Sequence, residues 1–260
     1  MVKYLIITDG YLKRKKLLIL ICIIILTFGI TVESKGGFMN TKTICEIINL
    51  EGISQIEAKF TIGKITFYKC DSEMIEVNGS ISGNSSRGIK VKRSGNVLNI
   101  KQKIGFLPIK IGVTELFIGI PADYNKNLSI SQSTGKLTIK KVSVDSLNVK
   151  TTAASIDIDD ILYKDFNLKT GSGWSNIDLK RKCGNTKIDS SVGKVKLKVN
   201  EIGGDIKFYG GVMVGTIEIP KNGSINIIDL SNKNQISAST SEDGNYNIII
   251  KPGVRKIKII

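Results

Sequence analysis

The sequence feature that most constrains the fold is a period-two alternation of apolar and polar residues, which begins near Ile53. It is clear in Ile75-Glu-Val77, Ile89-Lys-Val91 and Leu116-Phe-Ile118, and groups of Gly, Asn and Ser interrupt it. Alternate side chains of a β-strand point to opposite faces, so this period indicates strands that bury one face. We therefore expect an all-β fold of short strands joined by turns.

After Pro121 the apolar centres of these strands recur about every ten residues, and the connections between them alternate in kind. One kind is small, as in STGK, TTAAS and GSGWSN, and the other carries apolar or charged residues, as in KKVSVDS and DDILYKD. The full repeat is therefore about 20 residues with two strands. Such repeats bury their apolar faces only by stacking, which predicts a β-solenoid with two strands per coil. An antiparallel meander or sandwich is the alternative, and it requires equivalent hairpin turns every ten residues or so.

The N-terminal segment differs from the rest of the chain. Four basic residues, Lys13 to Lys16, precede the uncharged run LLILICIIILTFGITV. This order is typical of an export signal, which is either cleaved or retained as an anchor. We expect a retained transmembrane helix over residues 17–33, with residues 1–16 as a basic cytoplasmic tail by the positive-inside rule. Secretion after signal cleavage is the alternative.

The remaining chain is expected to consist of a linker over residues 34–50 and one β-strand-repeat domain over residues 51–260. Within this domain, residues 51–121 form N-terminal strands and residues 122–260 form the solenoid repeats. The open end of a solenoid needs a cap, and the segment from Asn245 to Ile260 is the candidate. Cys45 and Cys70 are predicted to be buried free thiols, although a pair formed after export is an alternative.

Several of these segments together resemble a known family. They are the anchor LKRKKLLILICIIILTF, the strand LFIGIP, and the repeats STGKLTIKKVSVDSLNVKTTAASIDI and SSVGKVKLKV. The chain resembles the bacterial putative-adhesin family of β-strand-repeat domains, related to the head GIN domains, over about residues 50–260. The resemblance implies a surface β-solenoid, often placed near envelope-stress or anti-sigma systems. It implies no established biochemical activity and no catalytic residues.

The composition argues against an enzyme. The chain has no histidine, which removes the commonest general base and metal ligand. Ser133-Thr-Gly-Lys136 and Ser191-Val-Gly-Lys194 match the S-x-x-K motif of penicillin-recognising enzymes, but those enzymes carry it on a helix and here it falls in strand connections. We therefore predict a non-catalytic protein without cofactor or metal. A β-helix polysaccharide-active enzyme is kept as an alternative.

Strand periodicity also predicts which side chains face solvent. On one strand of each coil four lysines point to one face, opposed by few acids, and the chain carries a formal net charge of +15. These lysines are Lys150, Lys169, Lys187 and Lys207. Repulsion between them would be relieved by an anionic partner, which we expect to be an envelope polymer such as teichoic acid, or an anionic lipid surface, rather than nucleic acid. The alternative is a soluble lysine face that protects the sheet from aggregation.

Two further positions are singled out. Asp157 and Asp178 are predicted to be neighbours on the other strand of adjacent coils, where pairing with lysine is favoured over a calcium site. Trp174, the one tryptophan, is expected to pack against a coil edge, with stacking on a sugar ring as the alternative.

These features together predict a single-pass cell-membrane protein with its C-terminal domain outside the cytoplasm. Its expected role is that of an adhesin or envelope scaffold. The alternative role is an envelope-stress regulator that acts through protein contacts.

Overall fold

The computed structural model describes residues 41–82, 86–104, 114–220, 225–230, 235–236, 245–251 and 256–260. Every regular secondary-structure element in these residues is a β-strand, as the alternation predicts. The fifteen strands are β1 (Thr41–Asn49), β2 (Gln55–Cys70), β3 (Met74–Ser82), β4 (Ser86–Ser94), β5 (Val97–Ile104), β6 (Thr114–Pro121), β7 (Asn127–Lys140), β8 (Ser146–Asp159), β9 (Asp165–Cys183), β10 (Asn185–Ile202), β11 (Ile206–Glu218), β12 (Ile225–Asp229), β13 (Gln235–Ile236), β14 (Tyr246–Ile250) and β15 (Lys256–Ile259).

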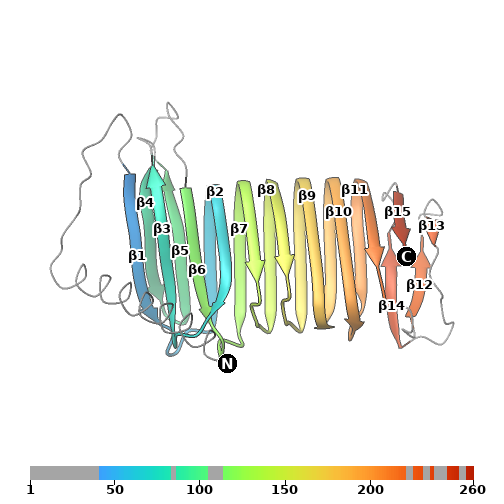
Figure 1. Ribbon diagram of the computed structural model, residues 1–260, viewed down its shortest axis with the longest axis horizontal. Coiled ribbons are helices and arrows are strands. Elements are labelled where there is room, and N and C mark those ends of the chain that lie inside the picture. Colours follow the sequence, from blue (N-terminus) through green and yellow to red (C-terminus); the bar gives the residue numbers. More distant parts are fainter. Residues whose placement is uncertain are drawn as a thin grey trace, which may run out of the picture. The chain divides into compact units, whose positions relative to one another are not determined.

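Strands β7 to β11 are the coils of a flattened solenoid (Figure 1). Each is one long strand that runs up one side, bends at a tight corner and returns down the other side. Neighbouring coils pair in parallel and in register along both halves, so that Leu128 pairs with Leu147 and Leu147 with Phe166. The parallel pairing confirms the predicted β-solenoid and contradicts a meander for these coils.

The tight corners of neighbouring coils stack directly on one another. This close stacking explains why the corners fall in the small-residue connections. Gly63 of β2 pairs with Gly135 of β7, and Gly173 of β9 pairs with Gly193 of β10. Gly135 has a φ of 110°, and a Cβ at this position would collide with the carbonyl oxygen of Gly63. The Gln132 side-chain amide, just beneath the corner, donates a hydrogen bond to the same carbonyl at 2.8 Å. Only small residues therefore fit most of these corners.

The longer connections at the opposite edge close the other end of each coil. In the connection between β7 and β8, Val142 and Val144 are buried, and in the next connection Ile161 and Tyr163 are buried. Tyr163 shares a hydrogen bond with the hydroxyl of Thr186, whose oxygen lies 2.6 Å away. Apolar residues in these connections thus seal the core from below.

The core lies between the two halves of the stacked coils and is mainly aliphatic. Its fully buried side chains come from the inward positions of each strand. They include Ile56, Ile65, Leu137, Leu147, Ile156, Ile158, Phe166, Ile177, Leu197, Ile206 and Phe208. A continuous aliphatic column of this kind makes each coil depend on its neighbours for burial.

The N-terminal part adds β5 and β6 to the first coil in parallel, and further strands join these two in antiparallel order. Strand β2 already has the shape of a coil and pairs with β7 on both sides of its corner, so the stack begins before residue 122. Strands β3 and β1 add to β6 in antiparallel order, and the β4–β5 hairpin adds to the first half of β2. Strand β1 lies inside the segment 34–50 expected to be a linker, because its alternating residues pair with β3. Cys45 and Cys70 are not joined by a disulfide; Cys70 is buried, as expected, whereas Cys45 is only partly buried.

The C-terminal end departs from sequential order. Strand β14 lies between β11 and β12, and β15 lies between β11 and β13. The segment from Asn245 to Ile260 is therefore inserted into the stack, and the expectation that it caps the solenoid is wrong. The physical reason lies at Asn247, whose backbone and side-chain N–H groups both donate to Asp205 Oδ1, at 3.0 and 3.2 Å. In addition, Ile248 and Ile250 are fully buried there, while Ile227 of the outer β12 is only partly buried.

The predicted anchor over residues 17–33 lies outside the described residues. Within the described part of the chain, no helix has the length and apolar character that crossing a bilayer requires.

Candidate functional site

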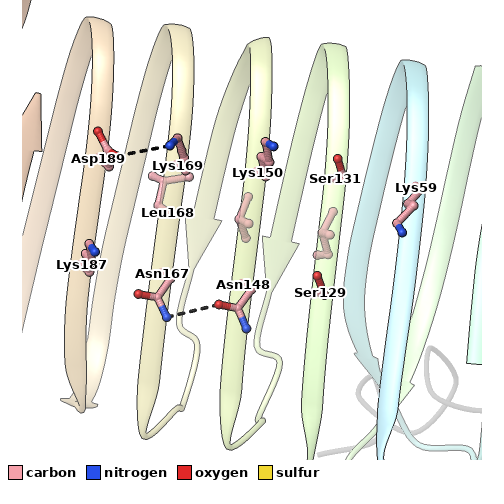
Figure 2. Close-up of a pocket in the computed structure, with 12 residues that line it drawn as sticks. Lys59, Ser129, Ser131, Asn148, Lys150, Asn167, Leu168, Lys169, Lys187 and Asp189 are labelled. Atoms are coloured by element: carbon pink, nitrogen blue, oxygen red, sulfur yellow. Dashed lines mark hydrogen bonds and ion pairs between the residues drawn. The ribbon is translucent and has the colours of Figure 1, made fainter. Parts of the chain in front are cut away.

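An open groove of about 490 Å³ crosses the outer side of one sheet, over the first halves of β2 and of the coils β7 to β10 (Figure 2). Four lysines line it: Lys59, Lys150, Lys169 and Lys187. We call the outer side of the sheet around these four residues the basic face. Asn148, Asn167, Ser129 and Ser131 supply amide and hydroxyl groups, and Asp189 is the one acidic residue that lines the groove.

The parallel register arranges lysines in a row across the strands. Lys59 of β2 pairs with Ser131 of β7, which pairs with Lys150 of β8, which pairs with Lys169 of β9. On the other side, Lys59 pairs with Lys101 of β5, and Lys101 pairs with Lys90 of β4. Directly paired residues point to the same side of a sheet, so these five lysines form one row, which we call the lysine row. The row crosses six strands, and at a spacing of about 4.8 Å it is about 24 Å long.

Few carboxylates neutralise the lysine row. Lys59 contacts Glu57 Oε2 at 3.0 Å, and Lys169 contacts Asp189 Oδ2 at 3.8 Å, while their side chains remain 54% and 68% exposed. Lys90, Lys101 and Lys150 are exposed and have no ion pair with any described residue. Exposed ion pairs of this kind contribute little free energy, and three of the five lysines have none. The row therefore keeps most of its positive charge available to a ligand.

A second row of polar side chains runs beside the lysine row. Asn148 pairs with Asn167, Asn167 with Lys187, and Lys187 with Lys207. The Asn167 amide donates to Asn148 Oδ1 at 3.2 Å (Figure 2). The Lys187 ammonium lies 4.9 Å from the centre of the Tyr209 ring, which fixes this lysine by a cation–π contact. The amides of Asn148 and Asn167 therefore flank the C-terminal end of the lysine row, and Lys187 and Lys207 continue the second row beyond it.

The opposite sheet presents mixed and paired charges. Lys180 contacts Asp159 at 2.7 Å, and this hydrogen bond raises the pKa of Lys180. Lys196 contacts Glu218 at 3.0 Å. The described residues contain no group of His, Cys, Asp or Glu placed to hold a metal ion. The opposite sheet therefore places Lys180 and Lys196 in ion pairs, beside the exposed lysines Lys140 and Lys198.

One predicted contact on this sheet is wrong. Asp157 neighbours Asn176, which donates to its Oδ1 at 3.2 Å, and Asp178 neighbours Asp159 instead. The register differs because Ser175, not an apolar residue, takes the buried position beside Ile156.

The structure places all four predicted lysines on the outer side of one sheet. Lys150, Lys169 and Lys187 line the groove, and Lys207 lies one strand beyond it. Lys150 and Lys169 are in one row, whereas Lys187 and Lys207 are in the other. Sequence reasoning missed Lys59, Lys90 and Lys101, which precede the regular repeat; the alternation around Ala58 and Ile100 would have marked Lys59 and Lys101 as outward-facing.

Trp174 lies at a corner of β9 and is 50% exposed, so that half of its surface is covered and half is open to solvent.

Several solved structures are similar to this chain. Among solved structures, a putative cell adhesion protein from Clostridium sporogenes is 14% identical with a TM-score of 0.43, covering 85% of this chain and 100% of that one. A putative adhesin from Bacteroides fragilis is 18% identical with a TM-score of 0.38, covering 88% and 99%. A putative adhesin from Parabacteroides merdae is 12% identical with a TM-score of 0.39, covering 86% and 97%. No curated protein matches.

A family model also matches most of the chain. The model described as Toastrack DUF4097 matches residues 53–256, which include the first coil, the lysine row and the inserted strand β14. The match also agrees with the resemblance noted from the repeat segments. This chain therefore belongs to the Toastrack DUF4097 family.

Proposed function

We propose that this chain is a non-catalytic, membrane-tethered extracytoplasmic scaffold that holds an anionic envelope polymer along its basic face. The observation that carries the proposal is the lysine row, in which Lys101, Lys150 and Lys90 have no acidic partner among the described residues. Stacking places Lys90 and Lys101 on adjacent strands and Lys150 three strands further on, at a spacing of about 4.8 Å per strand, and an extended polyanion would relieve the repulsion along the row.

The shape of the site favours a linear ligand. The row runs along the solenoid axis, across the strands, and the groove beside it is open rather than enclosed. A chain of phosphodiesters could contact successive lysines over about 24 Å, while the amides of Asn148 and Asn167 donate to its oxygens. A small compact anion would meet only one or two of these donors.

The chemistry of the groove supports binding rather than catalysis. Its lining consists of lysines, amides, serines and one carboxylate on a rigid sheet. A nucleophile hydrogen-bonded to a general base is the usual requirement for covalent hydrolysis, and among the described contacts neither serine of the groove has a hydrogen bond to a lysine or to Asp189. The basic and apolar N-terminal sequence supports the tether.

The test uses the full-length chain in nanodiscs of neutral phosphatidylcholine, titrated with purified poly(glycerol phosphate) at several salt concentrations. The variant Lys59→Gln/Lys150→Gln/Lys169→Gln/Lys187→Gln removes four charges from the groove. Each lysine–phosphate contact adds about 0.7 to the slope of log affinity against log salt for a flexible polyanion. We expect the variant to bind more weakly and to lose a slope of about 3, scaled from that value.

A matched control removes the same charge from the opposite sheet, by Lys140→Gln/Lys180→Gln/Lys196→Gln/Lys198→Gln. We expect this control to keep most of the affinity and the salt slope. Equal losses in the two variants would show that binding follows net charge alone. An unchanged affinity in the groove variant would also contradict the proposal.

A further inference from the structure

The tight corners form one continuous edge of the solenoid, opposite the longer connections, and we call it the corner edge. It passes through Gly63, Gly135, Ala154, Gly173 and Gly193, which lie at equivalent places on β2 and β7 to β10. In Figure 1 the corners of β7 to β11 lie side by side at one edge of the stack. Small residues there are explained by the close stacking of the corners.

Close stacking does not explain the apolar residues of the corner edge. Trp174, Val192 and Val214 lie on three successive coils and are 50%, 53% and 46% exposed. Lys194 pairs directly with Trp174 on one side and with Val214 on the other. An aromatic, two valines and a lysine are thus gathered where turns of a soluble protein are usually polar.

The corners of coils β7 to β11 carry charge of one sign. The corner segments 132–136, 151–155, 170–175, 190–194 and 210–215 contain no Asp or Glu, while Lys136 and Lys194 are both exposed. Tryptophan with aliphatic neighbours and flanking lysines is the composition that favours a membrane–water interface. A surface that combines negative charge with an apolar interior would complement this edge.

The chain also enters the solenoid at the corner edge. Strand β6 begins at Thr114, which lies against the corner at Gly63. Thr114 pairs with Ile81 near the end of β3, and the neighbouring Ser82 pairs with Thr41 at the start of β1. Thr41 is therefore at the same edge as the corners.

This entry point limits the orientation of a tethered solenoid. Residues 34–40 separate the apolar run 17–33 from Thr41, and seven extended residues reach about 25 Å at most. A tether of this length would keep Thr41 within about 25 Å of a bilayer that holds the apolar run, and Thr41 lies at the edge that also carries Trp174. Seven strand spacings, about 34 Å, separate β1 from β10, so an edge that lies flat brings both ends to the surface.

We propose that the corner edge docks on an anionic lipid bilayer, with Trp174, Val192 and Val214 at the interface and Lys136 and Lys194 beside anionic headgroups. The inference rests on the proposed membrane tether. Three half-exposed apolar side chains bind weakly alone, and the tether compensates by raising their effective concentration at the surface. The basic face then stands upright from the membrane, where it remains accessible to a polymer.

The test uses Trp174 as its own reporter, because it is the one tryptophan of the chain. The full-length chain is reconstituted into vesicles of phosphatidylcholine alone or with phosphatidylglycerol, with and without lipids brominated on the acyl chain. In the anionic vesicles we expect a blue-shifted emission and several-fold stronger quenching by brominated lipid than in neutral vesicles. Quenching by acrylamide from the aqueous side should fall correspondingly.

The variants separate the edge from general electrostatics. Lys136→Glu/Lys194→Glu should lose the blue shift and the bromine quenching, and Val192→Ser/Val214→Ser should weaken both. The matched control Lys140→Glu/Lys198→Glu, on a broad face, should retain them. Bromine quenching that is equal in the corner-edge charge variant and in the control would overturn the assignment of the edge.

The remaining outcomes distinguish the two proposals. A chain that fails to float with neutral vesicles lacks the tether, which would overturn the tether and the docked edge together. A chain that floats while Trp174 stays open to acrylamide and is not quenched by bromine would overturn the docked edge alone. A blue shift that poly(glycerol phosphate) or raised protein concentration produces without lipid would assign the edge to that polymer or to a second copy instead.

Discussion

Replacing Gly135 by alanine should strongly destabilise the solenoid, because this position combines an unfavourable backbone conformation with a blocked space. Its φ of 110° lies in a region that L-residues rarely adopt, and strain of this kind costs about 1–3 kcal/mol. The added Cβ would also collide with the Gly63 carbonyl, which the Gln132 amide holds at 2.8 Å. We expect a total loss of about 3 kcal/mol in the free energy of unfolding, since relaxation would disturb both coils.

The assay is thermal unfolding of the full-length chain in mild detergent, followed by far-ultraviolet circular dichroism. For a domain of this size, each kcal/mol lowers the Tm by about 2–4 °C, so Gly135→Ala should lower the Tm by roughly 6–12 °C. Gly95→Ala is a control for strain alone, because Gly95 has a φ of 59° and an added Cβ there meets nothing within 4 Å. It should cost about 1 kcal/mol.

A second control changes the corner of the next coil. Ala154 pairs with Gly135 and already carries a Cβ, so Ala154→Gly should cost only about 0.5–1 kcal/mol through chain entropy. A Gly135→Ala protein whose Tm matches that of Gly95→Ala would refute the view that the corners interlock.

Two further predictions concern the core and the C-terminal insertion. Ile158→Ala, at a fully buried position in the middle of the stack, should cost about 2–5 kcal/mol, measured by urea unfolding. Burial would raise the pKa of Asp205, but hydrogen bonds from Asn247 and the charge of Lys207 outweigh it and lower the pKa. The stabilisation from ionised Asp205 is therefore present above its ordinary pKa of 3.8 and is lost as the pH falls through the lower folded value. Urea midpoints should show this acid-dependent loss in the native chain and less of it in Asp205→Asn.

The coil and its outward faces could be predicted from the sequence because two local signals agree. Alternation around Leu147 and Phe166 fixes which side chains are buried, and thus places Lys150 and Lys169 outside. The alternation of small and apolar connections reveals that two strands make one repeat. Both signals arise within a single coil, so they need no knowledge of distant contacts.

The register between coils was harder to predict where a polar residue takes a core position. Ser175 is buried beside Ile156, yet Ile177 looks like the start of the apolar pattern, which shifts the predicted pairing of Asp178 by two residues. Thr186 is likewise buried, with Tyr163 as its hydrogen-bond partner. Polar residues at core positions are accommodated by contacts between coils. The sequence of a single strand does not reveal these contacts.

The ends of the stack depend on long-range choices. The lysine row extends to Lys101 and Lys90 because the β4–β5 hairpin joins the first coil, a pairing that no local pattern specifies. At the other end, β12 could have followed β11 directly, but β14 takes that place through Asp205 and Asn247. Competition between alternative strand pairings decides the strand order at both ends. The periodicity of the sequence carries no information about this competition.

The central claim is that parallel stacking in register aligns lysines from successive coils into one row. It is tested most directly by disulfide formation between Lys150→Cys and Lys169→Cys in a chain whose native cysteines are replaced by serine. Directly paired positions meet the Cα separation of about 4.4–6.8 Å that a disulfide requires, so we expect rapid and nearly complete cross-linking within one chain. The pair Lys150→Cys and Asn167→Cys, two residues out of register, should cross-link poorly. Preferential cross-linking of this second pair would contradict the register and, with it, the lysine row.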